Sequence, residues 1–210
     1  LGVDGFMVDV EADLSQGLPG FDVVGLPGAA VKESRDRVRA AMKNSGFAYP
    51  VSRITVNLAP ADIRKEGAGF DLPLAAAVLA AAGVLSAEQL GNVMMAGEIG
   101  LNGEIHAVSG ILPMIIRARE EKCRFCVVPY DNLKEAHLIP DMKVIGVADL
   151  QEMIRYVSAP DSYKKAVETG KKSPQENSVD FCEIHGQESL KRAVEIAVSG
   201  FHNLLMIGPP

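Results

Sequence analysis

The segment 71–82 constrains the fold most, because it is rich in alanine and apolar on almost every side. A helix without a polar face has to be buried, and small side chains let neighbouring backbones approach closely. Asp71 can cap this helix, and Pro73 lies in its first turn, where the missing N–H costs nothing. The segment therefore predicts a buried helix over 72–82, with the other elements packed around it.

The rest of the chain alternates between strand and helix patterns. Apolar residues at every second position, or short apolar runs, predict strands at 1–11, 21–26, 54–58, 93–99, 104–108, 125–129, 144–147 and 204–207. Helical spacing predicts helices at 29–44, 111–121, 132–138, 150–157 and 188–199. We expect the first two strands to form an antiparallel pair around the turn 15–20. Asn102-Gly103 predicts a second hairpin, and Ser86 a capping box.

Composition places the chain among ordinary globular proteins. Of its 210 residues, 48% are hydrophobic and 23% charged, which argues against disorder. The net charge of −6 excludes a basic nucleic-acid surface over the whole chain, but not a local patch. Three cysteines are too few for a disulfide framework, which favours a cytoplasmic location. We expect no membrane-spanning segment, because the apolar runs are too short, and no signal peptide.

The composition changes near residue 159, where Lys, Glu, Ser and Pro replace the large apolar residues. Such a stretch is typical of a linker between domains. We therefore expect one domain over 1–157, a linker over 158–179, and the beginning of another domain over 180–210.

The last segment resembles the start of a phosphate-binding loop. A strand pattern runs into Gly208-Pro209-Pro210, and such a turn wraps backbone N–H groups around phosphates. With Ile184-His185-Gly186 upstream, it resembles the opening of the magnesium-chelatase-like branch of AAA+ ATPases. The resemblance implies that 184–186 lies against adenine. The nucleotide-binding residues that it implies in this chain are Ile184, His185, Gly186, Gly208, Pro209 and Pro210.

The ends of the chain suggest a fragment of a longer parent protein. The chain starts at Leu1, and it stops at Pro210, before the lysine and the Ser/Thr that would complete the motif. We therefore expect ATP and Mg²⁺ to serve the parent, and this chain to bind them poorly and not to hydrolyse ATP. His202 is expected to satisfy backbone groups. The apolar strand at 204–207 is expected to invite pairing with another chain.

Two motifs in the middle of the chain, 65–73 and 97–105, resemble the Lon-protease-type domain, which has a ribosomal-S5-domain-2-like fold. With 17–27, 31–39 and the downstream segment, the chain resembles the ComM/YifB family of bacterial AAA+ proteins. The resemblance implies an α+β, two-layer domain with a mixed sheet and helices largely on one side. It also implies a hexameric, ATP-driven parent that acts on DNA, for example in branch migration during recombination, without contact with a membrane.

The catalytic pair of a Lon-type protease is a serine nucleophile and a lysine base within hydrogen-bond reach. By resemblance, the serine position falls on Gly69 and the lysine position on Leu112. Lys65 lies on the loop instead of the second helix, and Ser109 has no lysine in register. We expect a catalytically inactive module without a metal site. Two alternatives remain open: an active Ser/Lys peptidase that uses another serine, and a metal-inserting chelatase subunit.

Two further patterns have an ordinary structural explanation. Cys123 and Cys126 have the CxxC spacing of zinc and redox sites, but a second ligand pair is missing, because Cys182 is distant and His106 and His137 show no ligand spacing. We therefore expect core cysteines.

The helix over 29–44 carries a basic face of Lys32, Arg35, Arg37, Arg39 and Lys43. Glu33 and Asp36 interrupt this face, which favours a solvated surface over a nucleic-acid site. Arg53, Arg64 and Lys65 would extend it only if the fold brought them close.

Overall fold

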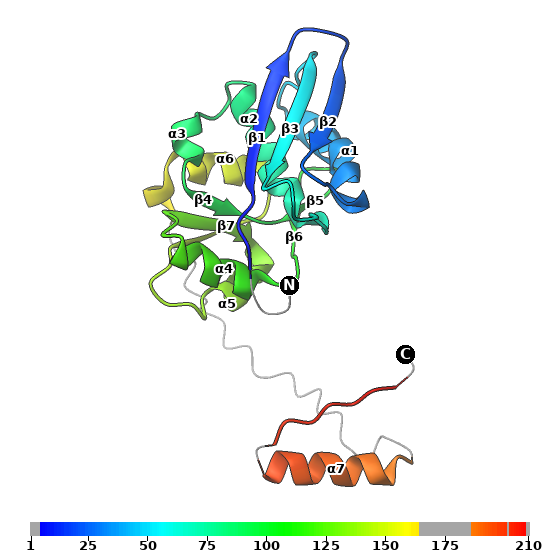
Figure 1. Cartoon of the computed structure of the whole chain (residues 1–210). Coiled ribbons are helices and arrows are strands. Elements are labelled where there is room, and N and C mark those ends of the chain that lie inside the picture. Colours follow the sequence, from blue (N-terminus) through cyan, green and yellow to red (C-terminus); the bar gives the residue numbers. More distant parts are fainter. Residues whose placement is uncertain (1–4, 164–185, 201, 209–210) are drawn as a thin grey trace. The chain divides into compact units, whose positions relative to one another are not determined.

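The computed structural model describes residues 5–163, 186–200 and 202–208. The chain divides into two compact units, Leu1–Lys165 and Ala166–Pro210. In the first unit, the described strands form two three-stranded sheets and a two-stranded ribbon, and helices cover them (Figure 1). The coarse prediction of an α+β domain is confirmed.

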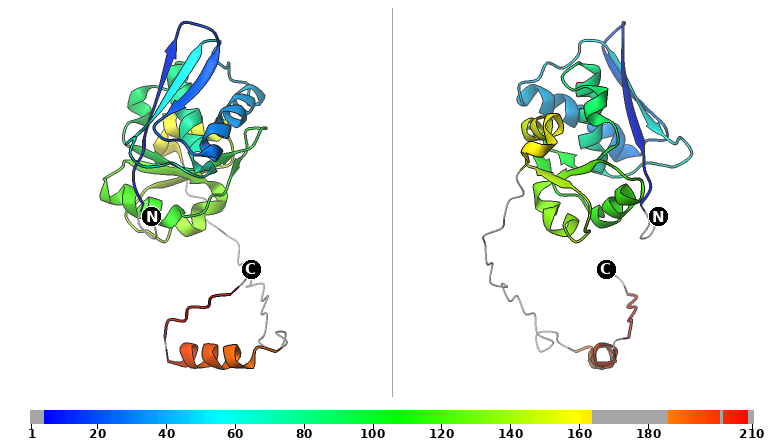
Figure 2. Two further views of the ribbon diagram at one scale, coloured as in Figure 1. Left: turned by 45° about the vertical axis from the view of Figure 1, so that its right-hand side comes forward. Right: turned by 90° about the vertical axis from the view of Figure 1, so that its left-hand side faces the viewer.

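The first sheet consists of β1 (Asp9–Ser15), β2 (Gly20–Val24) and β3 (Arg53–Ala59), in the order β1-β3-β2. β3 is antiparallel to β1 and parallel to β2. The predicted pairing of the first two strands is therefore wrong, because β3 lies between them. Ile54, Val56 and Leu58 give β3 a fully buried face, which favours the central position. β1 is an edge strand of this sheet, and it runs along one side of the unit in the right-hand view of Figure 2.

Helices α1 (Ala29–Asn44) and α2 (Asp71–Ala81) pack together on the inner side of this sheet. The 3-10 turn η1 (Ala68–Phe70) leads directly into α2. The prediction of a buried helix is confirmed, since eight of its residues are buried. The prediction that Asp71 caps the helix is wrong: Phe70 is the N-cap, and Asp71 is the first helical residue.

The second sheet is parallel and consists of β4 (Val93–Met95), β7 (Phe125–Pro129) and β8 (Val144–Val147). Every residue of β7 is buried. Phe125 and Val127 face the core shared with the first sheet, while Cys126 and Val128 face a second core. Helices α4 (Ile111–Glu120) and α5 (Leu133–Ala136) cover the second core, and α6 (Leu150–Ser158) belongs to the first.

The expectation of a mixed sheet with helices largely on one side holds for the first sheet only. The strands form separate sheets, and the parallel one is covered on both faces. The reason lies in the apolar runs of β7 and β8, because strands that are apolar on both faces have to be buried on both.

The predicted hairpin around Asn102-Gly103 is confirmed as β5 (Glu98–Ile99) paired with β6 (Ile105–His106). The strand predicted over 93–99 is divided instead between β4 and β5. Gly97 lies at the division, where its N–H donates to the Gly69 carbonyl and its carbonyl accepts from the Leu72 N–H, each at 3.0 Å. These two bonds join the segment before the hairpin to η1 and to the first turn of α2.

The remaining elements of the first unit are short. Ser86 and Gln89 form the predicted capping box of α3 (Ala87–Leu90). Two 3-10 turns, η2 (Tyr130–Asn132) and η3 (Pro160–Ser162), follow β7 and α6. The Tyr163 hydroxyl accepts a hydrogen bond from the Gly146 N–H at 3.2 Å. Residues up to 163 therefore still pack on this unit, and most of the predicted linker lies outside the described residues.

The second unit contains α7 (Glu188–Ser199), which ends at Gly200. The His202 N–H closes the helix end by donating to the Ala197 carbonyl at 2.8 Å. The prediction of a strand at 204–207 is wrong, because residues 202–208 have no regular secondary structure. A strand needs a neighbour for its backbone groups, and the described part of this unit offers none. Nowhere in the described ranges is a helix long and apolar enough to cross a membrane.

Candidate functional site

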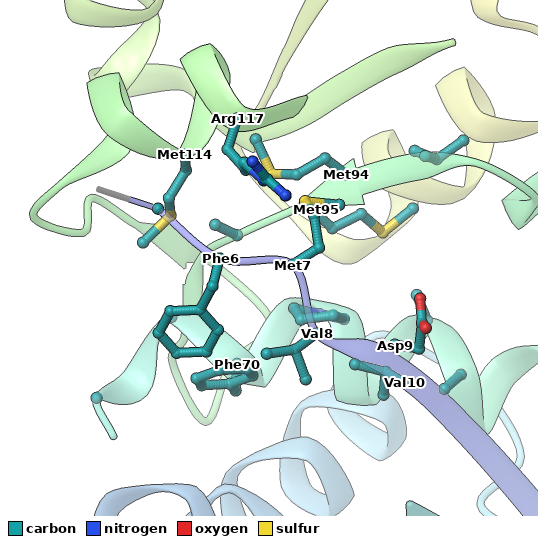
Figure 3. A pocket seen from close by; sticks show the side chains of 18 of the residues that line it. Phe6, Met7, Val8, Asp9, Val10, Phe70, Met94, Met95, Met114 and Arg117 are labelled. Atoms are coloured by element: carbon teal, nitrogen blue, oxygen red, sulfur yellow. The ribbon is translucent and has the colours of Figure 1, made fainter. Parts of the chain in front are cut away.

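A hollow of about 1700 Å³ opens beside the loop 62–70 in the first unit (Figure 3). Its walls come from residues 5–12, the loop, one side of α2, β4 and the start of α4. Four methionines line it: Met7, Met94, Met95 and Met114. Phe6 and Phe70 face each other across one end. Methionine is flexible and polarisable, so a methionine-lined surface adapts to differently shaped apolar ligands.

Gly69 lies on the wall of this hollow. A Cβ atom at Gly69 would contact only the Val108 Cγ1, at 3.9 Å, so there is room for a larger residue. Leu112 lies in the first turn of α4 and is not among the lining residues; its N–H donates to the Glu135 Oε1 at 3.1 Å. That these two positions correspond to the serine and lysine of a Lon-type dyad remains a prediction.

The hollow contains little that could activate a nucleophile. Ser109 is the only Ser or Thr among its described lining residues, and none of them is Lys or His. A serine needs an adjacent base to become a competent nucleophile. Cys123 also lines the hollow, but burial raises the pKa of its thiol and so disfavours the thiolate.

Lys65 belongs to the same loop but points away from the hollow. Arg64 and Glu66 line the hollow on either side of it, whereas Lys65 is fully buried. Its Nζ donates to the Gly25 carbonyl at 2.9 Å and to the Pro60 carbonyl. Its backbone pairs with Leu26 and Gly28. The ammonium group therefore fastens the loop to the chain segment before α1, and it does not face a serine.

The loop ends in a buried polar cluster around Asp71, formed by Ser34, Arg37, Asp71 and Ile99. Asp71 accepts from the Arg37 Nε at 2.6 Å and Nη2 at 2.9 Å. It also accepts from the Ser34 hydroxyl and from the Ile99 N–H, the latter at 3.1 Å. The hydrogen bond to Asp71 raises the pKa of Arg37, against the opposing effect of burial. This cluster joins α1, α2 and β5 behind the hollow.

Sequence reasoning missed this cluster. Arg37 was expected on the basic face of α1, but only 22% of its side chain is exposed. The available signal was Asp71 itself, because a carboxylate at the start of an otherwise apolar helix needs a buried partner.

The basic face is further reduced by local ion pairs. Arg35 pairs with Asp36 at 3.2 Å, and Arg37 is occupied by Asp71. The three residues that would extend the face do not do so: Arg53 pairs with Asp22, Arg64 pairs with Glu66, and Lys65 is buried. Lys32, Arg39 and Lys43 remain exposed on α1. The structure therefore favours the solvated face.

Cys123 and Cys126 are both buried and free, and both belong to the second core. Burial raises the pKa of Cys126 to about 12, so its thiol stays protonated near neutral pH. The prediction of core cysteines is confirmed. Among the described residues, no group of three His, Cys, Asp or Glu side chains is placed to hold a metal; Cys182 lies outside them.

The expected nucleotide-binding residues are only partly described. Gly186 has a left-handed backbone (φ +74°) just before α7, and Gly208 has open space around it. Ile184, His185, Pro209 and Pro210 lie outside the described residues. In this sequence Gly208 is followed by Pro209 and Pro210.

Comparison with known proteins gives two family matches along this chain. A family model described as "Subunit ChlI of Mg-chelatase" matches residues 10–132. A second, described as "Magnesium chelatase, subunit ChlI", matches residues 180–210. The Lon protease of Trichlorobacter lovleyi is 22% identical over 165 residues, which are 73% of this chain and 20% of that protein.

Two relatives match the whole chain. Competence protein ComM of Haemophilus influenzae is 41% identical over 214 residues, which cover 100% of this chain and 42% of the relative. YifB of Escherichia coli is 40% identical over 210 residues, 100% of this chain and 41% of the relative. The chain thus spans less than half the length of these relatives. It belongs to the ComM/YifB family of magnesium-chelatase-like proteins.

Proposed function

We propose that this chain is the non-catalytic N-terminal module of a magnesium-chelatase-like AAA+ ATPase that acts as a DNA motor, for example in branch migration during recombination of incoming DNA. The observation that carries the proposal is the match of the whole chain to a protein named for competence, the state in which a bacterium takes up DNA. The order of the two family matches, 10–132 and then 180–210, supports the arrangement of the module before the ATPase.

The module has the Lon-like, ribosomal-S5-domain-2-like fold over 1–157, followed by the linker 158–179 and the start of the ATPase. The similarity to Lon protease supports this fold. Inactivity is supported by the absence of Lys and His among the described residues that line the hollow, and by Lys65, whose ammonium is already bonded to two carbonyls. The longer protein uses ATP and Mg²⁺, assembles as a hexamer and works in the cytoplasm.

The decisive experiment uses a longer protein that carries this chain and the complete phosphate-binding loop. We expect it to hydrolyse ATP and to be stimulated more by a four-way DNA junction than by linear duplex of equal nucleotide content. Stimulation by neither DNA would contradict the motor. The same preparation should leave casein intact; casein turnover that a serine-directed inhibitor abolishes would show an active peptidase instead.

The wording of the family descriptions favours a second candidate, a subunit of a tetrapyrrole metal chelatase. This candidate makes the opposite prediction for the same ATPase assay. Hydrolysis would respond to a porphyrin-binding partner protein and would be indifferent to DNA.

A further inference from the structure

The segment that follows α6 runs along the outer edge of β8. In a parallel pair of strands, successive residues direct their backbone groups alternately to the two sides. The Lys143 carbonyl accepts from the Cys126 N–H of β7 at 2.8 Å, so Val144 and Gly146 direct their backbone groups away from β7. Within the described residues no strand pairs with β8 on that side. The backbone groups on this edge therefore need another partner.

Residues 159–163, which we call the strap, supply part of that partner. The Tyr163 hydroxyl accepts from the Gly146 N–H at 3.2 Å. The Tyr163 ring packs edge-on against Tyr156 of α6, with the two ring centroids 5.1 Å apart, and both rings contact the first core. The last residue of the strap thus fastens it to the edge that β7 leaves open.

A second fastening lies two residues earlier in the strap. The Asp161 carboxylate of η3 accepts from the Lys143 Nζ, directly before β8, at 2.7 Å. This hydrogen bond lowers the pKa of Asp161. Between the two fastenings, the Ser162 N–H and hydroxyl both donate to the Ala159 carbonyl, at 3.0 Å and 2.6 Å. These internal bonds fold the strap into one turn, so the two fastenings are joined.

The strap is held weakly compared with the sheet that it covers. Ala159, Asp161 and Ser162 are exposed, whereas every residue of β8 is buried. An exposed ion pair, such as that of Asp161, contributes little to stability. Segments with few buried apolar contacts open locally, while the rest of the protein stays folded. The strap therefore has the features of a segment that opens on its own.

We propose that the strap opens and closes as one piece and so sets the length of the connection between the two units. When it is closed, it covers the outer edge of β8, and the connection begins after Tyr163. When it is open, residues 159–163 join the connection and add up to roughly 17 Å of extended chain, while β7 and β8 stay paired. This device is independent of what the longer protein acts on, so its test does not depend on the proposed motor activity.

The first test asks whether the two fastenings open together, and it uses amide hydrogen exchange measured by NMR. Asp161→Lys replaces the ion pair by repulsion from Lys143 and leaves the Tyr163 hydroxyl in place. If the strap moves as one piece, the Gly146 N–H should exchange about threefold faster, although its own acceptor is intact. Glu120→Lys is the matched control, because it breaks an exposed ion pair with Arg117 on α4 and should leave the Gly146 exchange rate unchanged.

The reverse experiment breaks the other fastening. Tyr163→Phe removes only the hydroxyl, and the Ser162 N–H should then exchange about threefold faster, because the whole turn opens more often. The Cys126 N–H reports on the sheet, since it is bonded to the Lys143 carbonyl on the inner side of β8. Its exchange rate should be unchanged in both variants.

The second test measures the reach of the connection with two spin labels. In a Cys182→Ser background, Glu88→Cys on α3 and Glu195→Cys on α7 provide exposed labelling sites, while the other described cysteines are buried. Removing both fastenings, by Asp161→Lys together with Tyr163→Ala, should hold the strap open. We expect the upper limit of the label-to-label distances to increase by up to roughly 17 Å.

Three outcomes would overturn the proposal. An unchanged Gly146 exchange rate in Asp161→Lys would mean that the two fastenings are independent. Equal acceleration of the Cys126 N–H would mean that the parallel sheet opens together with the strap. An unchanged distance distribution in the chain without either fastening would mean that the strap does not set the length of the connection.

Discussion

The two sides of the loop 62–71 differ sharply in chemistry. On the side of the hollow, Gly69 contributes no side chain and the surrounding wall is rich in Met and Ala. On the opposite side, Lys65 and Asp71 are fully buried, and both are bonded to other segments of the chain. Buried charges are costly unless they have partners. The comparison indicates that the two buried charges, Lys65 and Asp71, hold the loop in place, whereas Gly69 leaves room on its open side.

The variant Asp71→Ala is expected to have the largest effect on stability. It would leave Arg37 without its carboxylate and the Ile99 N–H without an acceptor. Removing one member of a buried ion pair costs about 3–5 kcal/mol. We expect a loss of that size in the free energy of unfolding, measured by urea titration.

The control for this variant is Asp36→Ala on α1. Its carboxylate pairs with Arg35 on the surface, where such pairs contribute about 0–1 kcal/mol. Equal destabilisation by the two variants would mean that the cluster around Asp71 does not hold the loop.

The next test is Lys65→Met, which keeps the length of the side chain and removes its donors. The Gly25 and Pro60 carbonyls would then lack this partner. A buried group that loses its hydrogen bond costs about 1–3 kcal/mol. Urea unfolding should show a loss in this range, whereas Arg64→Met, at an exposed pair with Glu66, should change stability by less than about 1 kcal/mol. An unchanged free energy of unfolding in Lys65→Met would contradict the conclusion that the Lys65 ammonium group holds the loop in place.

A smaller effect is expected on the open side of the loop. Gly69→Ser should change the unfolding free energy by no more than about 0.5 kcal/mol, because the new Cβ meets only the Val108 Cγ1 at 3.9 Å. Gly97→Ser is the matched control: its Cβ would lie 3.0 Å from the Ile105 Cγ2 and 3.2 Å from the Leu72 Cδ2. Overpacking of this kind costs about 1–3 kcal/mol. Similar costs for both variants would contradict an open wall at Gly69.

The smallest expected effect is a difference between Cys123 and Cys126 in the rate of alkylation. In a Cys182→Ser background, iodoacetamide at pH 8 should modify Cys126 more slowly than Cys123. The pKa of Cys126 is raised to about 12 from the model-peptide value of 9.0, so only a minute fraction is thiolate. The Cys126 thiol ionises at a lower pH in the unfolded chain than in the folded protein. Its contribution to the stability of the folded state is therefore present below pH 9 and is lost as the pH rises toward 12. Faster modification of Cys126 would show that the second core opens readily.

Much of the local structure was predictable because it depends on neighbouring residues. Helical spacing located α1, α4, α6 and α7, and the Ser86 capping box and the hairpin at Asn102-Gly103 were found from short motifs. Which strands pair was not predictable in this way. β3 separates β1 from β2, and residues 93–99 contribute to two sheets, because pairing depends on contacts between segments far apart in the chain.

The candidate site shows the same division. The sequence by itself determined that residues 65–73 and 97–105 resemble a Lon-type domain and that Gly69 and Leu112 cannot act as nucleophile and base. Only the tertiary structure decided that Arg37 and Asp71 form a buried pair and that Lys65 turns inward. The physical reason is that a side chain's chemistry belongs to its residue, whereas its partner and its burial are set by the packing of distant segments.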